Sequence, residues 1–171
     1  CGKDGGIIDI GGGSTEIQVV CGGKKVYAKS IPVGAVRLTD ACGQDEKKLD
    51  ALCESRVCEF GNVPRTEFTA IGGTATTAAA MILGLESYDA TKIEGFVLER
   101  NALFSLKEKI CETSVEERKG LKGLQAGREE IIGSGLAFLC AIFLKFGIKS
   151  VKISDKDNLE GYLLRKIKGN I

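Results

Sequence analysis

Polar and apolar side chains alternate along the first thirty residues, and short glycine runs interrupt them. The runs 5–10, 15–20 and 25–31 are each expected to form a strand, because a period of two is typical of a strand with one buried face. The glycines at 11–13 and 22–23 are expected to form tight turns, the first rich in residues that tolerate positive φ. The pattern therefore predicts an antiparallel meander of three strands.

Beyond Pro32 the apolar positions recur with a helical period. Helices are expected over residues 33–40, 45–60, 75–83, 99–111, 125–146 and 157–167, and strands over 66–71 and 150–154. Thr113/Glu116 and Ser114/Glu117 both fit a capping box for one short helical turn. The order of elements predicts an α/β fold, with a five-stranded mixed sheet and helices on both faces, in a single domain over residues 1–171.

Composition narrows the range of functions. The chain carries 24 Lys and Arg against 23 Asp and Glu, a net charge of +1, which argues against a DNA, RNA or membrane-surface partner. It has no histidine, which excludes a Ser–His–Asp triad and a His-ligated zinc site. Its seven cysteines include no CxxC pair, and such usage is typical of a reduced, cytoplasmic protein.

Two further features of the sequence concern a membrane-spanning segment and whether the chain is part of a longer protein. The longest apolar run, residues 136–144, is too short to span a bilayer, and no signal peptide opens the chain. The chain begins at Cys1, and its only methionine is Met81. We therefore expect a fragment of a longer protein.

The first predicted hairpin contains a pair of acidic residues. If Gly12 and Gly13 form its turn, Asp9 lies directly opposite Glu16 with Cβ atoms roughly 4.5–5.5 Å apart. Like charges at this spacing destabilise a sheet unless a cation lies between them or one carboxyl is protonated. This favours a metal site, with Mg²⁺ bound through water, beside a phosphate-binding turn. A turn one residue longer or shorter would instead put the two carboxylates on opposite faces.

Two glycine-rich turns are candidates for binding phosphate. The first lacks the lysine of a Walker loop and the third glycine of a dinucleotide fingerprint, so it is expected to bind an anion through backbone N–H groups and hydroxyls. It comprises Gly11, Gly12, Gly13, Ser14 and Thr15. The second lies between a strand and a helix, where free N–H groups and the helix dipole favour an anion. It comprises Gly72, Gly73, Thr74 and Thr76, with Thr77 as a further hydroxyl.

Some of the candidate phosphate-binding residues could instead have a purely structural role. The second turn could be a tight strand–helix connection with Thr74 as the N-cap. Arg128 and Arg37 are candidate phosphate ligands, and each could equally form a surface ion pair. Gly133 and Gly135 are expected to allow close helix packing.

Five segments together resemble the exopolyphosphatase/guanosine pentaphosphate phosphatase family. The first, residues 9–16 (DIGGGSTE), is similar to the second phosphate motif of that family. The others follow in the family's order and are residues 31–38, 71–77, 123–128 and 153–161. The resemblance covers nearly the whole chain.

The resemblance implies a ribonuclease H-like, actin-like ATPase fold and hydrolysis of a terminal phosphoanhydride of polyphosphate or guanosine pentaphosphate with Mg²⁺. By motif, Asp9 would position metal or water and Glu16 would be the essential acidic residue. The family has a preceding domain that carries the first phosphate hairpin and a water-activating carboxylate. The chain therefore resembles the second, C-terminal domain alone, expected by itself to be inactive or nearly so, with that N-terminal domain as its partner.

Two other functions remain possible on the sequence alone. A kinase-like or activator domain of the same fold would bind ATP, and a non-catalytic module would bind polyphosphate or an alarmone without cleaving it. The sequence does not separate polyphosphate from guanosine pentaphosphate as substrate. Apolar surface left by the missing domain could pair two copies, so a homodimer is one oligomeric state left open.

Overall fold

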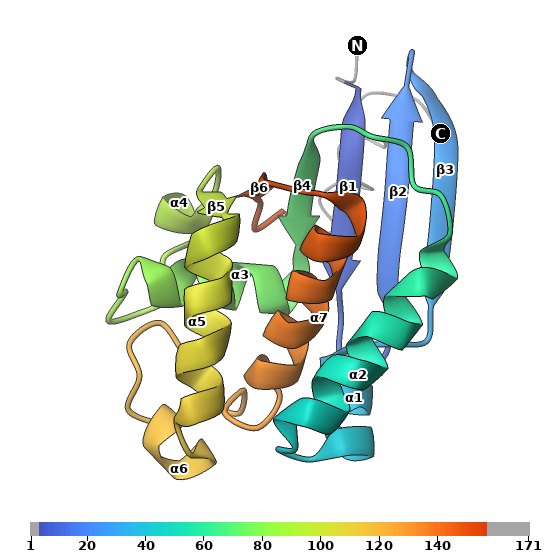
Figure 1. Ribbon diagram of the computed structural model, residues 1–171. Coiled ribbons are helices and arrows are strands. Elements are labelled where there is room, and N and C mark those ends of the chain that lie inside the picture. The colour runs from blue at the N-terminus through green and yellow to red at the C-terminus, as the bar shows by residue number, and fades with distance from the viewer. Residues whose placement is uncertain (1–3, 157–171) are drawn as a thin grey trace.

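A computed structural model describes residues 4–156 and shows a six-stranded mixed sheet with the strand order β3-β2-β1-β4-β6-β5 (Figure 1). The predicted meander is confirmed. Its strands β1 (Gly5–Ile10), β2 (Thr15–Cys21) and β3 (Lys24–Ile31) pair antiparallel in sequence order. Parallel strands β4 (Phe68–Ile71) and β6 (Ser150–Ile153) extend the sheet from β1.

The predicted count of five strands is wrong by one. The sixth strand, β5 (Val97–Glu99), pairs antiparallel with β6 at the sheet edge. It has only three residues, and its last residue, Glu99, also fits the start of the helix that follows. A segment this short carries too few alternations to be distinguished from the end of a helix.

Most helices begin and end within a few residues of their predicted limits. They are α1 (Ala35–Cys42), α2 (Glu46–Val57) with the 3₁₀ turn η1 (Cys58–Phe60), α3 (Gly72–Ile82), α4 (Ala90–Ile93), α5 (Arg100–Glu112), α6 (Val115–Arg118) and α7 (Ile132–Phe146). The structure selects Ser114/Glu117 as the capping box of α6. The short α4 was not predicted, and the helix predicted over residues 157–167 lies outside the described residues.

The start of α7 differs most from the prediction, because the segment from residue 125 to 131 is turns rather than helix. Gly127 has φ +82°, which a helix does not allow. Side chains from elsewhere also bind carbonyls of this segment: Arg118 donates to the Glu129 carbonyl and Gln44 to that of Glu130. Tertiary hydrogen bonds therefore override the local helical pattern.

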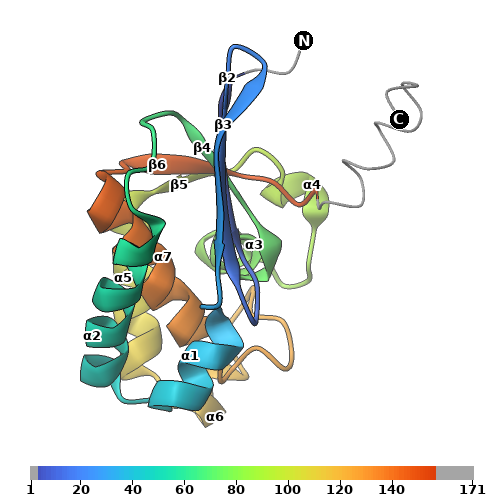
Figure 2. The same ribbon diagram turned by 90° about the vertical axis from the view of Figure 1, so that its right-hand side faces the viewer.

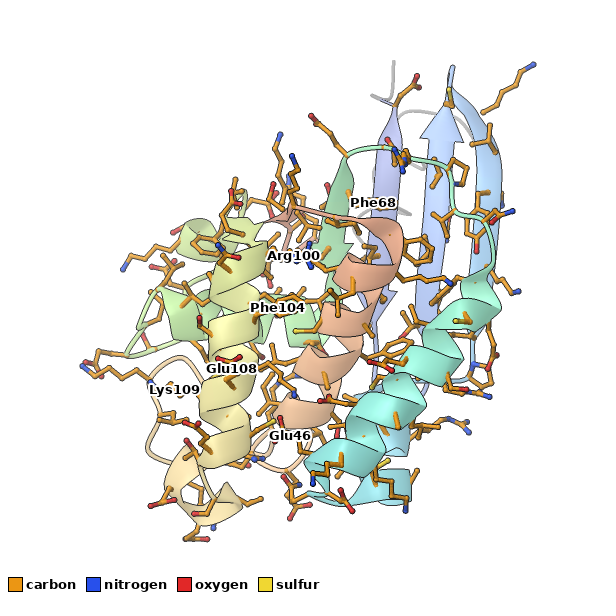
Figure 3. All side chains as sticks on the ribbon, viewed as in Figure 1. Glu46, Phe68, Arg100, Phe104, Glu108 and Lys109 are labelled. Atoms are coloured by element: carbon orange, nitrogen blue, oxygen red, sulfur yellow. The ribbon has the colours of Figure 1, made fainter. Side chains whose placement is uncertain are left out.

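The core lies between the sheet and the helices α2, α5 and α7, which cover one face, while α4 lies on the other side (Figure 2). Phe68, labelled in Figure 3, packs beside β1, where a Cβ at Gly6 would lie 2.3 Å from its ring. The helices approach closely at Gly135 of α7, where a Cβ would lie 2.5 Å from Thr74 Oγ1. This confirms the packing role predicted for Gly135. No helix within residues 4–156 is long and apolar enough to cross a membrane.

Candidate phosphate- and metal-binding site

The candidate site lies at the carboxyl ends of β1 and β4. These two strands are parallel neighbours, so both end at the same edge of the sheet (Figure 1). The first glycine turn (residues 11–15) follows β1, and the second (residues 72–76) begins α3 directly after β4. Elements sixty residues apart in sequence are therefore brought together by one strand pairing.

Asp9 and Glu16 are direct partners across β1 and β2, as the sequence predicts. Burial and the charge of Glu16 together raise the pKa of Asp9 above its ordinary value, with burial the larger cause. The pair thus has the unfavourable electrostatics expected of two carboxylates without a cation between them.

The two carboxylates lean toward opposite sides. Ser30 on β3 donates a 2.5 Å hydrogen bond to Glu16 Oε1. Asp9 Oδ1 lies against Gly72, where a Cβ would stand only 2.4 Å from it. Glu16 is thus contacted from the β3 side of the pair, and Asp9 from the β4 side.

In the first turn, the backbone carbonyls point toward α1. The N–H of Ala35 donates to the Gly11 carbonyl, and those of Val36 and Arg37 donate to the Gly12 carbonyl. The glycines of this turn tolerate positive φ, but none of them adopts it. Gly34, which precedes α1, has to be glycine for space, because a Cβ at that residue would lie 2.5 Å from the Gly12 carbonyl oxygen.

Amide groups of the first turn remain available. Within residues 4–156, the N–H groups of Gly12, Gly13 and Ser14 form no hydrogen bond with protein, since the one bond inside the turn runs from the Gly11 N–H to the Ser14 carbonyl. Arg37 lies beside them, its Nε 3.6 Å from where a Cβ of Gly13 would lie. Consecutive free N–H groups beside a guanidinium form an arrangement that can bind an anion.

In the second turn, α3 begins without a side-chain cap, and its first N–H groups form no hydrogen bond with any residue that the structure describes. The guanidinium of Arg128 lies directly over Gly73, where a Cβ would stand 2.2 Å from Nη1. Its Nε donates to Gln125 Oε1, which holds the side chain in place. Arg128 therefore lies at the site, and no ion pair to a carboxylate is formed by it within the described part of the chain.

The threonine hydroxyls of the two turns are directed toward the interior of the protein. Thr15 is fully buried and donates to the Val33 carbonyl. Thr76 donates to the Gly72 carbonyl, while Thr74 packs against α7 and is no N-cap. Thr77 is also buried, and its hydroxyl has no partner among the described residues. What these turns can offer a ligand is backbone N–H, together with Ser14.

Sequence reasoning missed a buried arginine that supports the site. Arg118 is only 4% exposed and donates to the carbonyls of Ile110, Thr113 and Glu129 and to Gln44 Oε1. The Glu129 carbonyl belongs to the segment that carries Arg128, so Arg118 fixes that segment. Its neighbours Glu117 and Lys119 are charged, which is typical of an exposed segment, and most of its partners are distant backbone carbonyls, so no sequence signal marked it as buried.

Sequence reasoning also missed a contact between Tyr88 and Asp155, which lies on the β6 side of the site. The Tyr88 hydroxyl donates to the Asp155 carboxylate, and burial with that bond raises the pKa of Tyr88. Asp155 follows β6, whose carboxyl end lies at the same edge. The two residues are 67 positions apart in the sequence, so no local pattern predicts this contact.

The donor set at this edge fits magnesium. Within residues 4–156, no three His, Cys, Asp or Glu side chains gather to hold a metal by themselves, so Asp9 and Glu16 would supply two carboxylates. Mg²⁺ typically binds one or two carboxylates and completes its shell with water and substrate phosphate. The paired carboxylates beside two turns with free N–H groups match that preference.

At the site, Gly12 and Gly13 are exposed, and Asp9 and Glu16 are half-buried. A hollow of about 450 Å³ lies at the opposite end of β1 and is lined in part by Gly5, Ile7 and Lys152. None of the residues named above for the site lines that hollow.

Comparison with known proteins agrees with this geometry. Residues 3–169 match the model of the Ppx/GppA phosphatase family. The chain is 30% identical to Exopolyphosphatase 2 of Mycobacterium tuberculosis over 92% of its own length and 54% of that protein. It is also 30% identical to a bifunctional 3-dehydroquinate synthase/phosphatase of Fusobacterium nucleatum, over 94% of its length and 26% of that protein.

Solved structures agree as well. An Aquifex aeolicus member of the Ppx/GppA family superposes with a TM-score of 0.89 at 25% identity, covering 98% of this chain and 57% of that one. The α/β domain is thus of the actin-like ATPase, ribonuclease H-like class. The chain belongs to the Ppx/GppA phosphatase family, and it spans about half the length of the mycobacterial relative.

Proposed function

We propose that this chain is the second, C-terminal domain of a phosphatase that hydrolyses terminal phosphoanhydride bonds of polyphosphate or guanosine pentaphosphate, and that it supplies half of the active site. The observation that carries the proposal is the meeting of the Asp9–Glu16 pair with two turns whose N–H groups are free. Phosphoryl transfer requires positioning and charge neutralisation, which these groups provide.

Each part of the edge has a role in the proposal. Asp9 and Glu16 would hold Mg²⁺, which when bound polarises phosphate oxygens and neutralises their charge. The N–H groups of Gly12, Gly13 and Ser14 would bind one phosphate, and those of Gly72 to Thr74 another. Arg37 and Arg128 would each neutralise further charge.

The proposal also assigns a role to the preceding domain. A preceding domain would cover the edge, exclude water from the reacting phosphate and contribute the group that activates the attacking water. By this account the 171 residues alone release phosphate slowly or not at all.

Phosphate release tests the proposal. The chain is compared with a form extended upstream through the preceding domain, each with Mg²⁺ and polyphosphate, guanosine pentaphosphate or ATP. We expect the extended protein to release phosphate from one or both of the first two compounds and the chain alone to be nearly inactive. Turnover of ATP alone would indicate the kinase-like class, and binding without hydrolysis a sensing module.

A further inference from the structure

A row of three polar residues crosses three neighbouring strands. Asp9 on β1 is the direct partner of Glu16 on β2, and Glu16 is the direct partner of Ser30 on β3. Side chains in one such row lie on the same face of a sheet. The exposed Ser30 therefore stands on the side of Glu16 away from Asp9.

The contact between Ser30 and Glu16 is short. Ser30 Oγ donates to Glu16 Oε1 at 2.5 Å, a length typical of a hydroxyl bonded to an ionised carboxylate. Within residues 4–156, the second oxygen, Oε2, takes no hydrogen bond. One oxygen of Glu16 is thus held by β3, and the other is free.

This asymmetry bears on which cation the pair can hold. Ca²⁺ takes six to eight oxygens and accepts both oxygens of one carboxylate, whereas Mg²⁺ requires six in a tight octahedron and takes one oxygen from each carboxylate. A carboxylate with one oxygen held by a hydroxyl is suited to the second mode. Its partner, Asp9, is likewise directed by its contact with Gly72.

We propose that Ser30 is a positioning residue that holds Glu16 as a one-oxygen ligand and thereby favours Mg²⁺ over Ca²⁺. The inference rests on the proposed function in taking Asp9 and Glu16 as the cation site. Ser30 itself touches neither phosphate nor metal in this account, and it acts through Glu16. Outer-shell hydrogen bonds of this kind typically change metal affinity by about 10–100-fold.

Two substitutions separate this role from a structural one. Ser30→Thr keeps the hydroxyl, whereas Ser30→Val has nearly the same shape without it, and both residues suit a strand. The whole chain of each variant and of the wild type is titrated with Mg²⁺ and with Ca²⁺. Binding is followed by the ¹³C carboxyl signal of Glu16, which is assigned by its loss in Glu16→Gln.

We expect Ser30→Val to weaken Mg²⁺ binding by about tenfold relative to Ser30→Thr and to leave Ca²⁺ binding unchanged or tighter. Equal Mg²⁺-to-Ca²⁺ ratios in the two variants would overturn the inference. So would a wild-type Glu16 signal that neither cation moves. Equal melting temperatures of the two variants show that the comparison reports on the site.

Phosphate release by the upstream-extended protein distinguishes this inference from the proposed function. If the wild type releases no phosphate while the cation ratio still depends on the hydroxyl, the proposed function fails and the role of Ser30 stands. If phosphate is released and the Mg²⁺-to-Ca²⁺ ratio is the same in both variants, the proposed role of Ser30 is wrong and the proposed function stands.

Discussion

Asp9 Oδ1 lies so close to Gly72 that a Cβ at residue 72 would stand 2.4 Å from it. This contact joins the Asp9–Glu16 pair to the second glycine turn, because Gly72 is the first residue of α3. Gly72 also has φ +83°, a conformation that other residues rarely adopt. The position is thus restricted to glycine both by backbone conformation and by a side-chain contact.

Gly72→Ala separates these two causes when compared with Gly84→Ala. Gly84 has φ +63° and nothing within 4 Å of its would-be Cβ, so its substitution carries the backbone cost alone. We expect Gly72→Ala to lose about 1–2 kcal/mol more of the free energy of unfolding than the control, since it also displaces the Asp9 carboxylate. Urea denaturation measures both. Equal losses would show that the Asp9 contact is unimportant.

Asp9 makes stability depend on pH. Its pKa is raised above the ordinary 3.8 by burial and by Glu16, so its ionisation costs stability as the pH rises through the raised value. At neutral pH, the free energy of unfolding of Asp9→Asn is therefore expected to exceed that of the wild type by up to about 1 kcal/mol. The difference is small because Asp9 is partly exposed and solvent screens its charge.

The sign of that effect is checked at lower pH. Below the ordinary pKa of 3.8 both proteins carry a neutral side chain at residue 9, and the difference in unfolding free energy should vanish. Urea denaturation without divalent cations, repeated between about pH 3 and 7, gives the profile. A wild type that is the more stable protein at neutral pH would contradict the electrostatic account.

Arg128 is expected to bind substrate phosphate. In the upstream-extended protein, Arg128→Gln should raise KM by about 10–100-fold, since it removes a charge-assisted hydrogen bond to phosphate. Arg100→Gln is the control, because the Arg100 guanidinium lies 5.4 Å over the Phe104 ring on α5 (Figure 3). Phosphate-release kinetics measure both variants. Equal KM values for Arg128→Gln and Arg100→Gln would show that Arg128 does not bind substrate phosphate.

The buried thiols are expected to be unreactive. Burial raises the pKa of Cys53 and of Cys140 to about 12, whereas Cys21 and Cys58 are exposed. Because the thiolate is the reactive form, iodoacetamide near pH 8 should label Cys21 and Cys58 in the folded protein, and Cys53 and Cys140 only after unfolding. Mass spectrometry of the labelled peptides reports this. Comparable labelling of Cys53 in the folded chain would contradict the described core.

Several features of the site follow from local sequence. The pairing of Asp9 with Glu16 could be predicted from a two-residue turn at Gly12 and Gly13, and the structure selects that register over those of a longer or shorter turn. The position of the second turn could be predicted too, because a strand followed by glycines and an alanine-rich helix has few arrangements. The family resemblance rests on five segments that include these two, and it is confirmed.

What the sequence did not predict depends on distant contacts. Arg128 lies over Gly73 because Arg118 and Gln44 bind the carbonyls that a continuous helix would have used. The threonine hydroxyls turn inward because neighbouring carbonyls and α7 receive them. The contact of Ser30 with Glu16 depends on the rotamers of two exposed side chains, which no local pattern specifies.

The measurement that tests the central claim most directly is Mg²⁺-dependent phosphate release by the upstream-extended protein and its Glu16→Gln variant. Glu67→Gln, at the other end of the sheet beside Gly6, is the matched control. Glu16→Gln keeps the shape of the side chain and removes the charge that would hold the cation, so we expect release to fall by at least about a hundredfold. Glu67→Gln should retain wild-type activity. Release that persists undiminished in Glu16→Gln would contradict the account.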